Sequence, residues 1–417
     1  MKSIRLFALA AVSGLAMSAL ALGAGTAKAD PVKVAYLTPK TGPLAFIGAM
    51  YEPTVDFVAK PFNAAGGWNG NPLQVTIYDD AGTTQGAADR FKQAIADGAR
   101  IFIGAGTSPL ASQNLADIQR WNQRNPDDPA VLLIVGAEGL NFTGKDCNYY
   151  SFRFTTTPYI RQNALAKVMK DKGMLGERIY SLQPDYTMGR EMEAASDENA
   201  KTYGYEVVGK ARHDVFKIRD FSPFIEKARG AKPDTVFTAS SGSDLLLILQ
   251  AAAASGLKTK FAGMFLDEPG NLASAGAAAL GGYSAQIFNA EAGGEAGDAY
   301  RAAFNTATGR DPVAFMSNGL ITMTMLTSAV KSLPAGSKIN IKQLITALEN
   351  NKVEWPMGTL SMRAQDHQLQ LPLVVSIVSK DAKHKLDGTD MGFQPVKLLS
   401  AEETSVPVSA ECKMVRP

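Results

Sequence analysis

The stretch RIFIGAGTSPLASQNLADI, residues 100–118, predicts a buried strand, a glycine turn and the first part of a helix. The apolar run RIFIGA is typical of a strand that is covered on both faces, and a helical pattern follows from Ala111 to Arg124. In open α/β sheets, ligands bind at such strand ends. This stretch therefore bears on both the fold and the function.

The same strand–helix alternation continues along the chain and then restarts after Phe154. It predicts an α/β protein with two doubly wound sheets in series, each covered by helices. Three helices, a hairpin-like segment and a polar tail follow, which indicates that the chain crosses back to complete the first lobe. The expected strands are 32–37, 73–80, 100–105, 130–135, 178–182, 206–211, 234–239 and 260–265, the hairpin is 371–380, and the expected helices are 50–63, 84–96, 111–124, 160–172, 191–203, 223–229, 244–254, 298–308, 314–332 and 341–350.

The first 29 residues have the features of a secretory signal peptide. Lys2 and Arg5 precede an apolar run over residues 7–25, and the triplet AKA at 27–29 is a small-x-small cleavage site. Cleavage would leave 388 residues with a net charge near −1, which argues against nucleic acid or an anionic membrane as the main partner. No later apolar run is long enough to span a bilayer. We expect an exported, soluble protein of two domains.

The sequence contains only two cysteines, Cys147 and Cys412. An even number in an exported chain predicts one disulfide, which would contribute at most about 5 kcal/mol through loop closure. Neither cysteine lies in a CxxC motif or near a histidine, so the sequence does not indicate a metal or redox role.

The sequence lacks the common catalytic motifs. It has no GxSxG elbow, no GxxxxGK[ST] loop and no HExxH, and none of His213, His367 and His384 has a second candidate ligand at metal spacing. His367, next to Asp366, is typical of a hydrogen-bonded turn histidine. The run SSGSD at 240–244 resembles a nucleophile loop, but without a histidine to serve it we favour ligand contact or helix capping. We expect no metal, no cofactor and no catalysis.

The glycine turn at the centre of the opening stretch favours a carboxylate over a nucleotide. A dinucleotide loop needs a third glycine, but Gly104-Ala105-Gly106 is followed by Thr107, Ser108 and Pro109. The turn offers backbone N–H groups and two hydroxyls at a helix N-terminus, where the helix dipole favours an anion. The alternative is that Thr107 or Ser108 only caps its own helix.

Other strand ends carry side chains that suit a small-molecule site. Hydroxyls, acids and aromatic rings at successive strand ends are typical of a pocket with apolar walls and few polar contacts. These side chains are Phe46 and Ile47 after the first strand, Glu138 after the fourth, Asp185, Tyr186 and Met188 in QPDYTMGRE, Ser241 in SSGSD, and Phe265, Asp267 and Glu268 in GMFLDEPG.

Five motifs follow one another along the chain: TGP at 41–43, NAAGGWNGNPLQVTIYDDAG at 63–82, IGAGTS, DYTMG, and GLKTKFAG at 256–263. Their order and spacing resemble the type I periplasmic solute-binding proteins of ABC importers, above all the leucine/isoleucine/valine-binding group. The resemblance covers nearly the whole mature chain. It implies two lobes joined by three crossovers that close on a ligand by a hinge. The expected division is a signal peptide 1–29, an N-terminal lobe 30–155 plus 289–368, a C-terminal lobe 156–288 plus 369–397, and a tail 398–417.

The resemblance also implies roles for individual residues. Ser108 matches the residue that receives the ligand carboxylate. The loop with Gly136, Ala137 and Glu138 matches one that supplies a carbonyl and a hydroxyl to the ligand's polar head. In the second lobe, Met188 and Ser241 match positions where the family often has aromatic side chains in contact with the ligand, and Tyr186 lies close by in the sequence.

Two departures from the family leave the ligand open. The family acid that pairs with an α-ammonium falls on Phe265, and the family threonine is replaced by Glu138. Either Glu138 or Asp267 binds the ammonium, or the ligand is an aromatic or other carboxylate without one. A buried Glu138 with no cationic partner would be costly, which favours a ligand with an amine or another donor. The positions often bridged in the first lobe of the family are Gly82 and Thr107 here.

We therefore expect a monomeric periplasmic binding protein for a small amino acid or related carboxylate of the branched-chain type. Its partner would be an inner-membrane ABC permease, and it would bind no nucleic acid. The alternatives are a binding protein for an aromatic acid or amide-type metabolite and a soluble ligand sensor.

Overall fold

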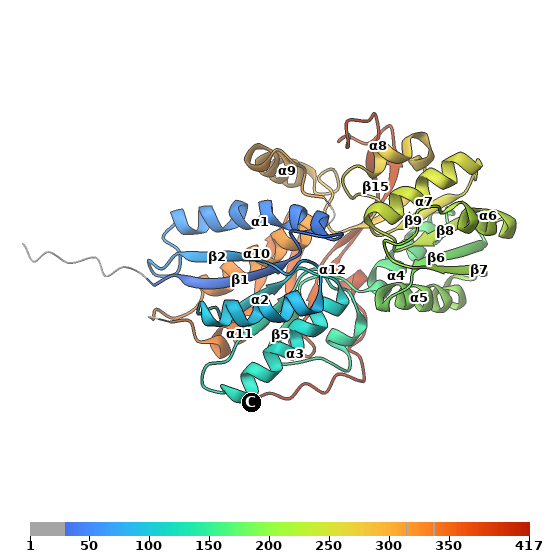
Figure 1. Cartoon of the computed structure of the whole chain (residues 1–417). Helices are drawn as coiled ribbons and strands as arrows, with labels where there is room; N and C mark the ends of the chain where they lie inside the picture. The colour runs from blue at the N-terminus through green and yellow to red at the C-terminus, as the bar shows by residue number, and fades with distance from the viewer. Residues whose placement is uncertain (1–29, 314, 337) are drawn as a thin grey trace, which may run out of the picture.

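The computed structural model describes residues 30–313, 315–336 and 338–417, which form two mixed β-sheets with helices around each (Figure 1). The predicted signal peptide lies outside the described residues. Within these ranges, no helix has the length and apolar character needed to cross a membrane.

The first sheet has eight strands, and the strand of the opening stretch lies in its interior, between β4 and β1. Five strands from the first part of the chain are parallel, and three strands from the last part extend the sheet beyond β5, as the expected return of the chain requires. The order is β11-β12-β13-β5-β4-β3-β1-β2, with β1 Val32–Thr38, β2 Leu73–Asp79, β3 Ile101–Gly104, β4 Val131–Ile134, β5 Ser151–Arg153, β11 Lys352–Trp355, β12 Gly358–Arg363 and β13 Gln368–Gln370.

Helices cover both faces of the first sheet, and β1 shows how the sequence specifies this arrangement. Val34 and Tyr36 belong to one core, whereas Ala35 and Leu37 belong to a second core on the opposite face. Both kinds of position are apolar because both faces are buried. The first core includes α1 Ala45–Ala64, α10 Phe315–Lys331 and α11 Ile341–Glu349, and the second includes α2 Thr84–Ala96 and α3 Ser108–Arg124.

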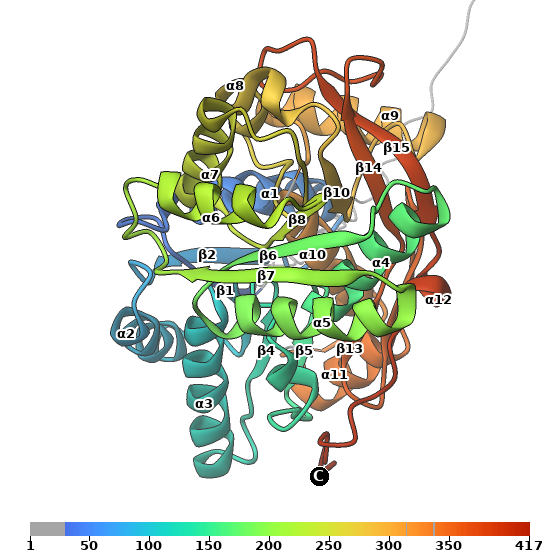
Figure 2. The same ribbon diagram turned by 90° about the vertical axis from the view of Figure 1, so that its right-hand side faces the viewer.

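The second sheet has seven strands in the order β15-β14-β10-β9-β8-β6-β7. The strands β6 to β10 are parallel, whereas β14 is antiparallel to both of its neighbours, β10 and the edge strand β15. Figure 2 shows α5 and α6 on opposite sides of β6 and β7. The elements are α4 Pro158–Asp171, β6 Arg178–Pro184, α5 Thr187–Tyr203, β7 Glu206–His213, α6 Ser222–Ala231, β8 Thr235–Thr238, α7 Gly242–Ser255, β9 Lys260–Gly263, α8 Asn271–Ala275, β10 Tyr283–Gln286, β14 Leu373–Ser379 and β15 Gly392–Leu399, with a short 3₁₀ helix at Gly276–Ala279. Another 3₁₀ helix, Leu140–Thr143, lies between β4 and β5 of the first sheet.

The chain crosses between the sheets after β5, after β10 through α9 (Gly294–Thr308), and after β13. The predicted fold class, two doubly wound lobes joined by three crossovers, is confirmed. The tail, which includes α12 (Ala401–Thr404), returns to the first lobe, where Cys412 forms the expected disulfide with Cys147. The lobe boundaries stay predictions, and β15 extends two residues into the segment expected as tail.

Some local predictions were wrong. The segment 371–380 is not a hairpin by itself, because its one strand, β14, pairs with β10 and β15. The helix expected from Ala111 begins at Ser108, since Pro109 fits the first turn of a helix, where a missing N–H leaves no hydrogen bond unmade. The strands β5, β10, β11, β12, β13 and β15 were not predicted.

Candidate ligand-binding site

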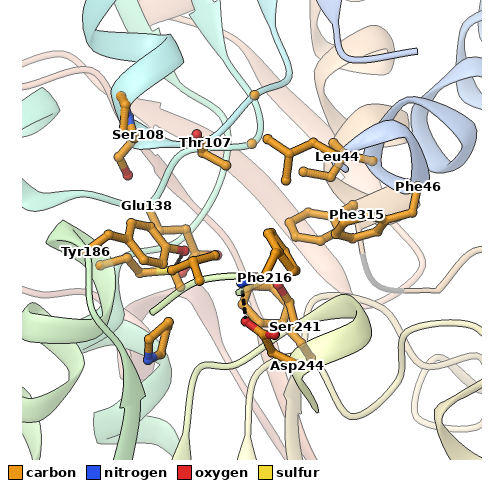
Figure 3. Close-up of a pocket in the computed structure, with 18 of the residues that line it drawn as sticks. Leu44, Phe46, Thr107, Ser108, Glu138, Tyr186, Phe216, Ser241, Asp244 and Phe315 are labelled. Atoms are coloured by element: carbon orange, nitrogen blue, oxygen red, sulfur yellow. Dashed lines mark hydrogen bonds between the residues drawn. The ribbon is translucent and has the colours of Figure 1, made fainter. Parts of the chain in front are cut away.

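A cavity of about 230 Å³ lies between the two lobes, where loops from both sheets meet at the carboxyl ends of the strands (Figure 3). Its wall is largely apolar, with a few polar groups among phenylalanine rings. The lining residues are Leu44, Phe46, Ile47, Ala105, Gly106, Thr107, Ser108, Pro109, Gly136, Glu138, Pro184, Tyr186, Met188, Val215, Phe216, Ser241, Asp244, Phe265 and Phe315.

The structure brings most of the predicted site residues to this one cavity. Ala137, Asp185, Asp267 and Glu268 are the exceptions. The side chain of Ala137 packs in the core under α2 and α3. Asp267 is buried and its Oδ2 accepts a hydrogen bond from Gln286 Nε2 at 3.1 Å. The predicted residues that line the cavity are Phe46, Ile47, Thr107, Ser108, Gly136, Glu138, Tyr186, Met188, Ser241 and Phe265.

The glycine turn after β3 forms the first-lobe end of the cavity. Thr107 is the N-cap residue of α3 but makes no capping hydrogen bond with its side chain, so the structure does not support the capping interpretation for Thr107. Ser108 is the first residue of the helix and is 5% exposed. The positive end of the helix dipole therefore lies at the cavity wall, beside a hydroxyl.

Gly136 allows the loop after β4 to lie directly against this turn. A Cβ atom at this position would be 2.7 Å from the carbonyl oxygen of Gly106 and 2.8 Å from that of Ala105. Contacts this short do not occur between real atoms of these types. The absence of a side chain at Gly136 thus sets the spacing between the Ser108 turn and Glu138.

Glu138 is buried against a cation that the sequence analysis missed. Its Oε1 accepts hydrogen bonds from Arg161 Nε at 3.1 Å and Thr156 Oγ1 at 2.7 Å, and Arg161 Nη2 lies 3.0 Å away. The side chains of both Glu138 and Arg161 are at most 6% exposed. Among the described residues, Glu138 Oε2 has no hydrogen-bond partner. Arg161 supplies the cationic partner that a buried Glu138 needs, while Oε2 of this cavity-lining residue stays buried without a partner among the described residues.

A second buried acid, Asp244, lines the cavity from the other lobe. Its Oδ2 accepts a hydrogen bond from the backbone N–H of Phe216 at 2.8 Å and lies 3.6 Å from His213 Nδ1. His213 Nε2 lies 2.8 Å from Ser240 Oγ. The expectation that no histidine serves the SSGSD run was therefore wrong. Burial lowers the pKa of His213 and raises that of Asp244.

Further contacts join the two lobes around the cavity, in addition to the pairing of Glu138 with Arg161 on α4. The rings of Phe46 and Phe216, from different lobes, meet edge-on with centroids 6.1 Å apart. On another side, the backbone N–H of Leu140 donates to both carboxylate oxygens of Glu191 on α5, at 3.0 and 3.1 Å. Burial raises the pKa of Glu191 to about 7. The structure thus has a closed cleft.

Several lining residues were not predicted, for different reasons. Leu44 and Phe216 lie in the loops after β1 and β7, and as apolar residues they carry no polar group that would mark them as ligand contacts. Phe315 begins α10, far along the chain, and stacks on Phe265 with ring centroids 5.0 Å apart. In the described part of the chain, no group of histidine, cysteine and acidic residues has the arrangement of a metal site.

Comparisons with known proteins agree with this architecture. A Leu/Ile/Val-binding protein homolog 4 of Brucella abortus (strain 2308) is 43% identical over 407 residues, covering 97% of this chain and 98% of that protein. A crystal structure of a leucine-, isoleucine-, valine-, threonine-, and alanine-binding protein from Brucella ovis, in a closed conformation, matches with a TM-score of 0.89 and 43% identity over 93% of this chain and 100% of that one.

More distant structures share the fold. One is a solute-binding protein of an ABC transporter from Rhodopseudomonas palustris BisB5, in complex with 3,4-dihydroxybenzoic acid, with a TM-score of 0.75 and 22% identity over 89% of this chain and 98% of that one. The family described as "Periplasmic binding protein" matches residues 31–383. This match and the 43% identical relatives show that the chain belongs to the leucine/isoleucine/valine-binding group of the type I periplasmic binding proteins.

Proposed function

We propose that this protein is the extracytoplasmic solute-binding component of an ABC importer and captures a small α-amino acid by hinge closure. It is exported to the periplasm by the signal peptide 1–29 and works as a monomer with an inner-membrane permease. The names of its relatives, which include leucine, isoleucine and valine as ligands, support this class of ligand.

One observation carries the proposal: the cavity combines a helix N-terminus with a buried carboxylate oxygen that has no partner in the described residues. The helix end and Ser108 suit a carboxylate, and Glu138 Oε2 suits an ammonium group. A zwitterion satisfies both. The phenylalanines of the wall would suit an aromatic acid as well, but an acid without an amine leaves Glu138 Oε2 buried and unpaired, at a cost of ~1–3 kcal/mol.

Calorimetry with matched ligands and variants tests this proposal. We expect leucine to bind more tightly than 4-methylpentanoate, its analogue without the amine. Glu138→Gln should weaken leucine far more than 4-methylpentanoate, because only leucine loses a charged partner. Ser108→Ala should weaken both by ~1–3 kcal/mol, because both present a carboxylate. Equal losses of the two ligands in Glu138→Gln, or unchanged affinities in Ser108→Ala, would contradict the proposed roles.

We further propose that the protein has no catalytic activity, although His213 lies between Ser240 and Asp244 as a base lies between a nucleophile and an acid in a catalytic triad. Ser240 is 2% exposed and does not line the cavity, so a bound ligand has no access to its hydroxyl. Mass spectrometry of the ligand recovered after incubation would show it unchanged. A product that forms only with Ser240 intact would overturn this proposal.

A further inference from the structure

Asp244 occupies the second-lobe side of the ligand cavity. It lies in the first turn of α7, is 2% exposed, and faces the cavity next to Ser241. Figure 3 shows Asp244 and Ser108 on opposite sides of the cavity, on ribbons from different lobes. A ligand held by its carboxylate at Ser108 therefore points its other end towards the lobe that carries Asp244.

The protein satisfies only part of this carboxylate. Asp244 Oδ2 accepts the N–H of Phe216, whereas Oδ1 has no hydrogen-bond partner among the residues described. A buried acceptor without a donor is costly. A role confined to accepting the Phe216 N–H would explain neither why Oδ1 is buried without a partner nor why Asp244 lines the cavity.

The nearby histidine does not supply the missing positive charge. Thr238 Oγ1 donates to Ser240 Oγ, so the Ser240 hydroxyl hydrogen is available for His213 Nε2, which then accepts. The remaining ring hydrogen is on Nδ1, which lies 3.4 Å from the carbonyl oxygen of Asp214 and 3.6 Å from Asp244 Oδ2. His213 is buried and its pKa is lowered by that burial, so the ring is neutral at pH 7.

We propose that Asp244 determines specificity for the ligand's side chain, and that the protein selects α-amino acids whose side chain carries a hydrogen-bond donor, such as a hydroxyl, amide or ammonium group. This inference rests on the proposed amino-acid binding function. Glu138 Oε2 takes the α-ammonium group, and Asp244 Oδ1 takes the side-chain donor. The phenylalanine rings between them contact the ligand's carbon atoms.

An apolar side chain at the same place leaves Asp244 Oδ1 without a donor. A binding site built around a buried polar group discriminates strongly against an analogue that cannot pair with it. The cost of an unpaired buried acceptor corresponds to a preference of roughly 5- to 150-fold for the donor-bearing ligand.

Calorimetry with three pairs of amino acids of matched shape tests this inference. The pairs are valine and threonine, leucine and asparagine, and norleucine and ornithine, in which the second member replaces carbon by a donor at increasing distance from Cα. The variants are Asp244→Asn, which keeps an acceptor for Phe216 N–H but turns the other atom into a donor, and Asp214→Asn, a control that removes an exposed charge from the neighbouring loop.

We expect the donor-bearing member of at least one pair to bind roughly 5- to 150-fold more tightly to the wild type. Asp244→Asn should abolish this preference, and Asp214→Asn should keep it. If the apolar member binds at least as tightly in every pair, or if Asp244→Asn weakens both members equally, the role of Asp244 is overturned while the proposed function stands. If no member of any pair binds, the proposed function itself fails.

Discussion

Replacing Arg161 by methionine should destabilise the protein strongly, because Arg161 is the only cation that pairs with Glu138 among the described residues. The change keeps most of the aliphatic volume but removes the guanidinium group. Breaking a buried ion pair from one side costs about 3–5 kcal/mol, since the remaining charge is left unpaired. Nη1 also donates to the carbonyl oxygens of Met264 at 3.3 Å and Ala285 at 2.6 Å. We therefore expect a loss of ~3–5 kcal/mol in the free energy of unfolding.

The double variant Arg161→Met/Glu138→Gln tests whether the lost stability comes from the unpaired charge of Glu138 or from the changed packing and hydrogen bonds around Arg161. It removes both charges, so it should be more stable than Arg161→Met alone, although two carbonyl groups still lose their donor. Urea unfolding of the ligand-free proteins at pH 7 measures the difference. The control is Arg229→Met, which breaks an exposed ion pair with Glu226 on α6 and should cost less than about 1 kcal/mol. A double variant no more stable than Arg161→Met would refute the reasoning that Arg161 compensates Glu138.

Two further predictions concern stability and the shape of the cavity. Burial raises the pKa of Glu268 to about 8, so the folded state holds a proton that the unfolded state has released, and the free energy of unfolding should fall as the pH rises from about 4.5 to about 8. In urea unfolding at pH 5 and pH 8, Glu268→Gln should lack this part of the decline; parallel declines would contradict it. Gly136→Ala should weaken leucine binding and lower the melting temperature, because its methyl group collides with two backbone carbonyl oxygens. Gly230→Ala, a control on α6 with open space around it, should leave leucine binding unchanged and should not lower the melting temperature, because alanine favours a helix over glycine. Normal leucine affinity in Gly136→Ala would contradict this, because it would show that the turn can move to make room for a methyl group.

The sequence predicted the parts of the fold that depend on local pattern. Strands such as β3 and β4 are uninterrupted apolar runs, and their burial on both faces follows from that composition. Most of the missed strands are short or contain polar residues. For example, β13 has the sequence QLQ, and β5 contains the buried Arg153, whose guanidinium donates hydrogen bonds to Gln368 and to the backbone of the loop after β4. Such strands form because a neighbour already present in the sheet pairs with them, which no local pattern reports.

The candidate site likewise contains residues that the local sequence pattern predicts and residues that it does not. Ser108 and Glu138 were predicted because they follow recognisable strands, whose carboxyl ends meet at one edge of the sheet. Arg161 was not, because its sequence context is an ordinary helix and its role comes from Glu138, 23 residues earlier. The pairing of His213 with Ser240 spans 27 residues and was missed for the same reason. The loops that form a cavity can be inferred from the order of elements, but its charge balance depends on contacts between them.

The placement of Asp244 links selectivity to closure. A ligand stabilises the closed form only by interactions that the open form lacks. In the proposed binding mode, the ligand's carboxylate and ammonium groups pair with Ser108 and Glu138, which both lie in loops of the first sheet. Asp244 belongs to the second lobe and reaches the ligand only when the lobes meet, as the contact between Phe46 and Phe216 shows they do in this structure. The proposed hydrogen bond from the ligand to Asp244 would therefore contribute to closure itself, and each 1.4 kcal/mol of it would raise the ratio of closed to open protein about tenfold. On this reasoning, two amino acids with the same main-chain groups differ less in their first encounter with the open protein than in the closed population they produce.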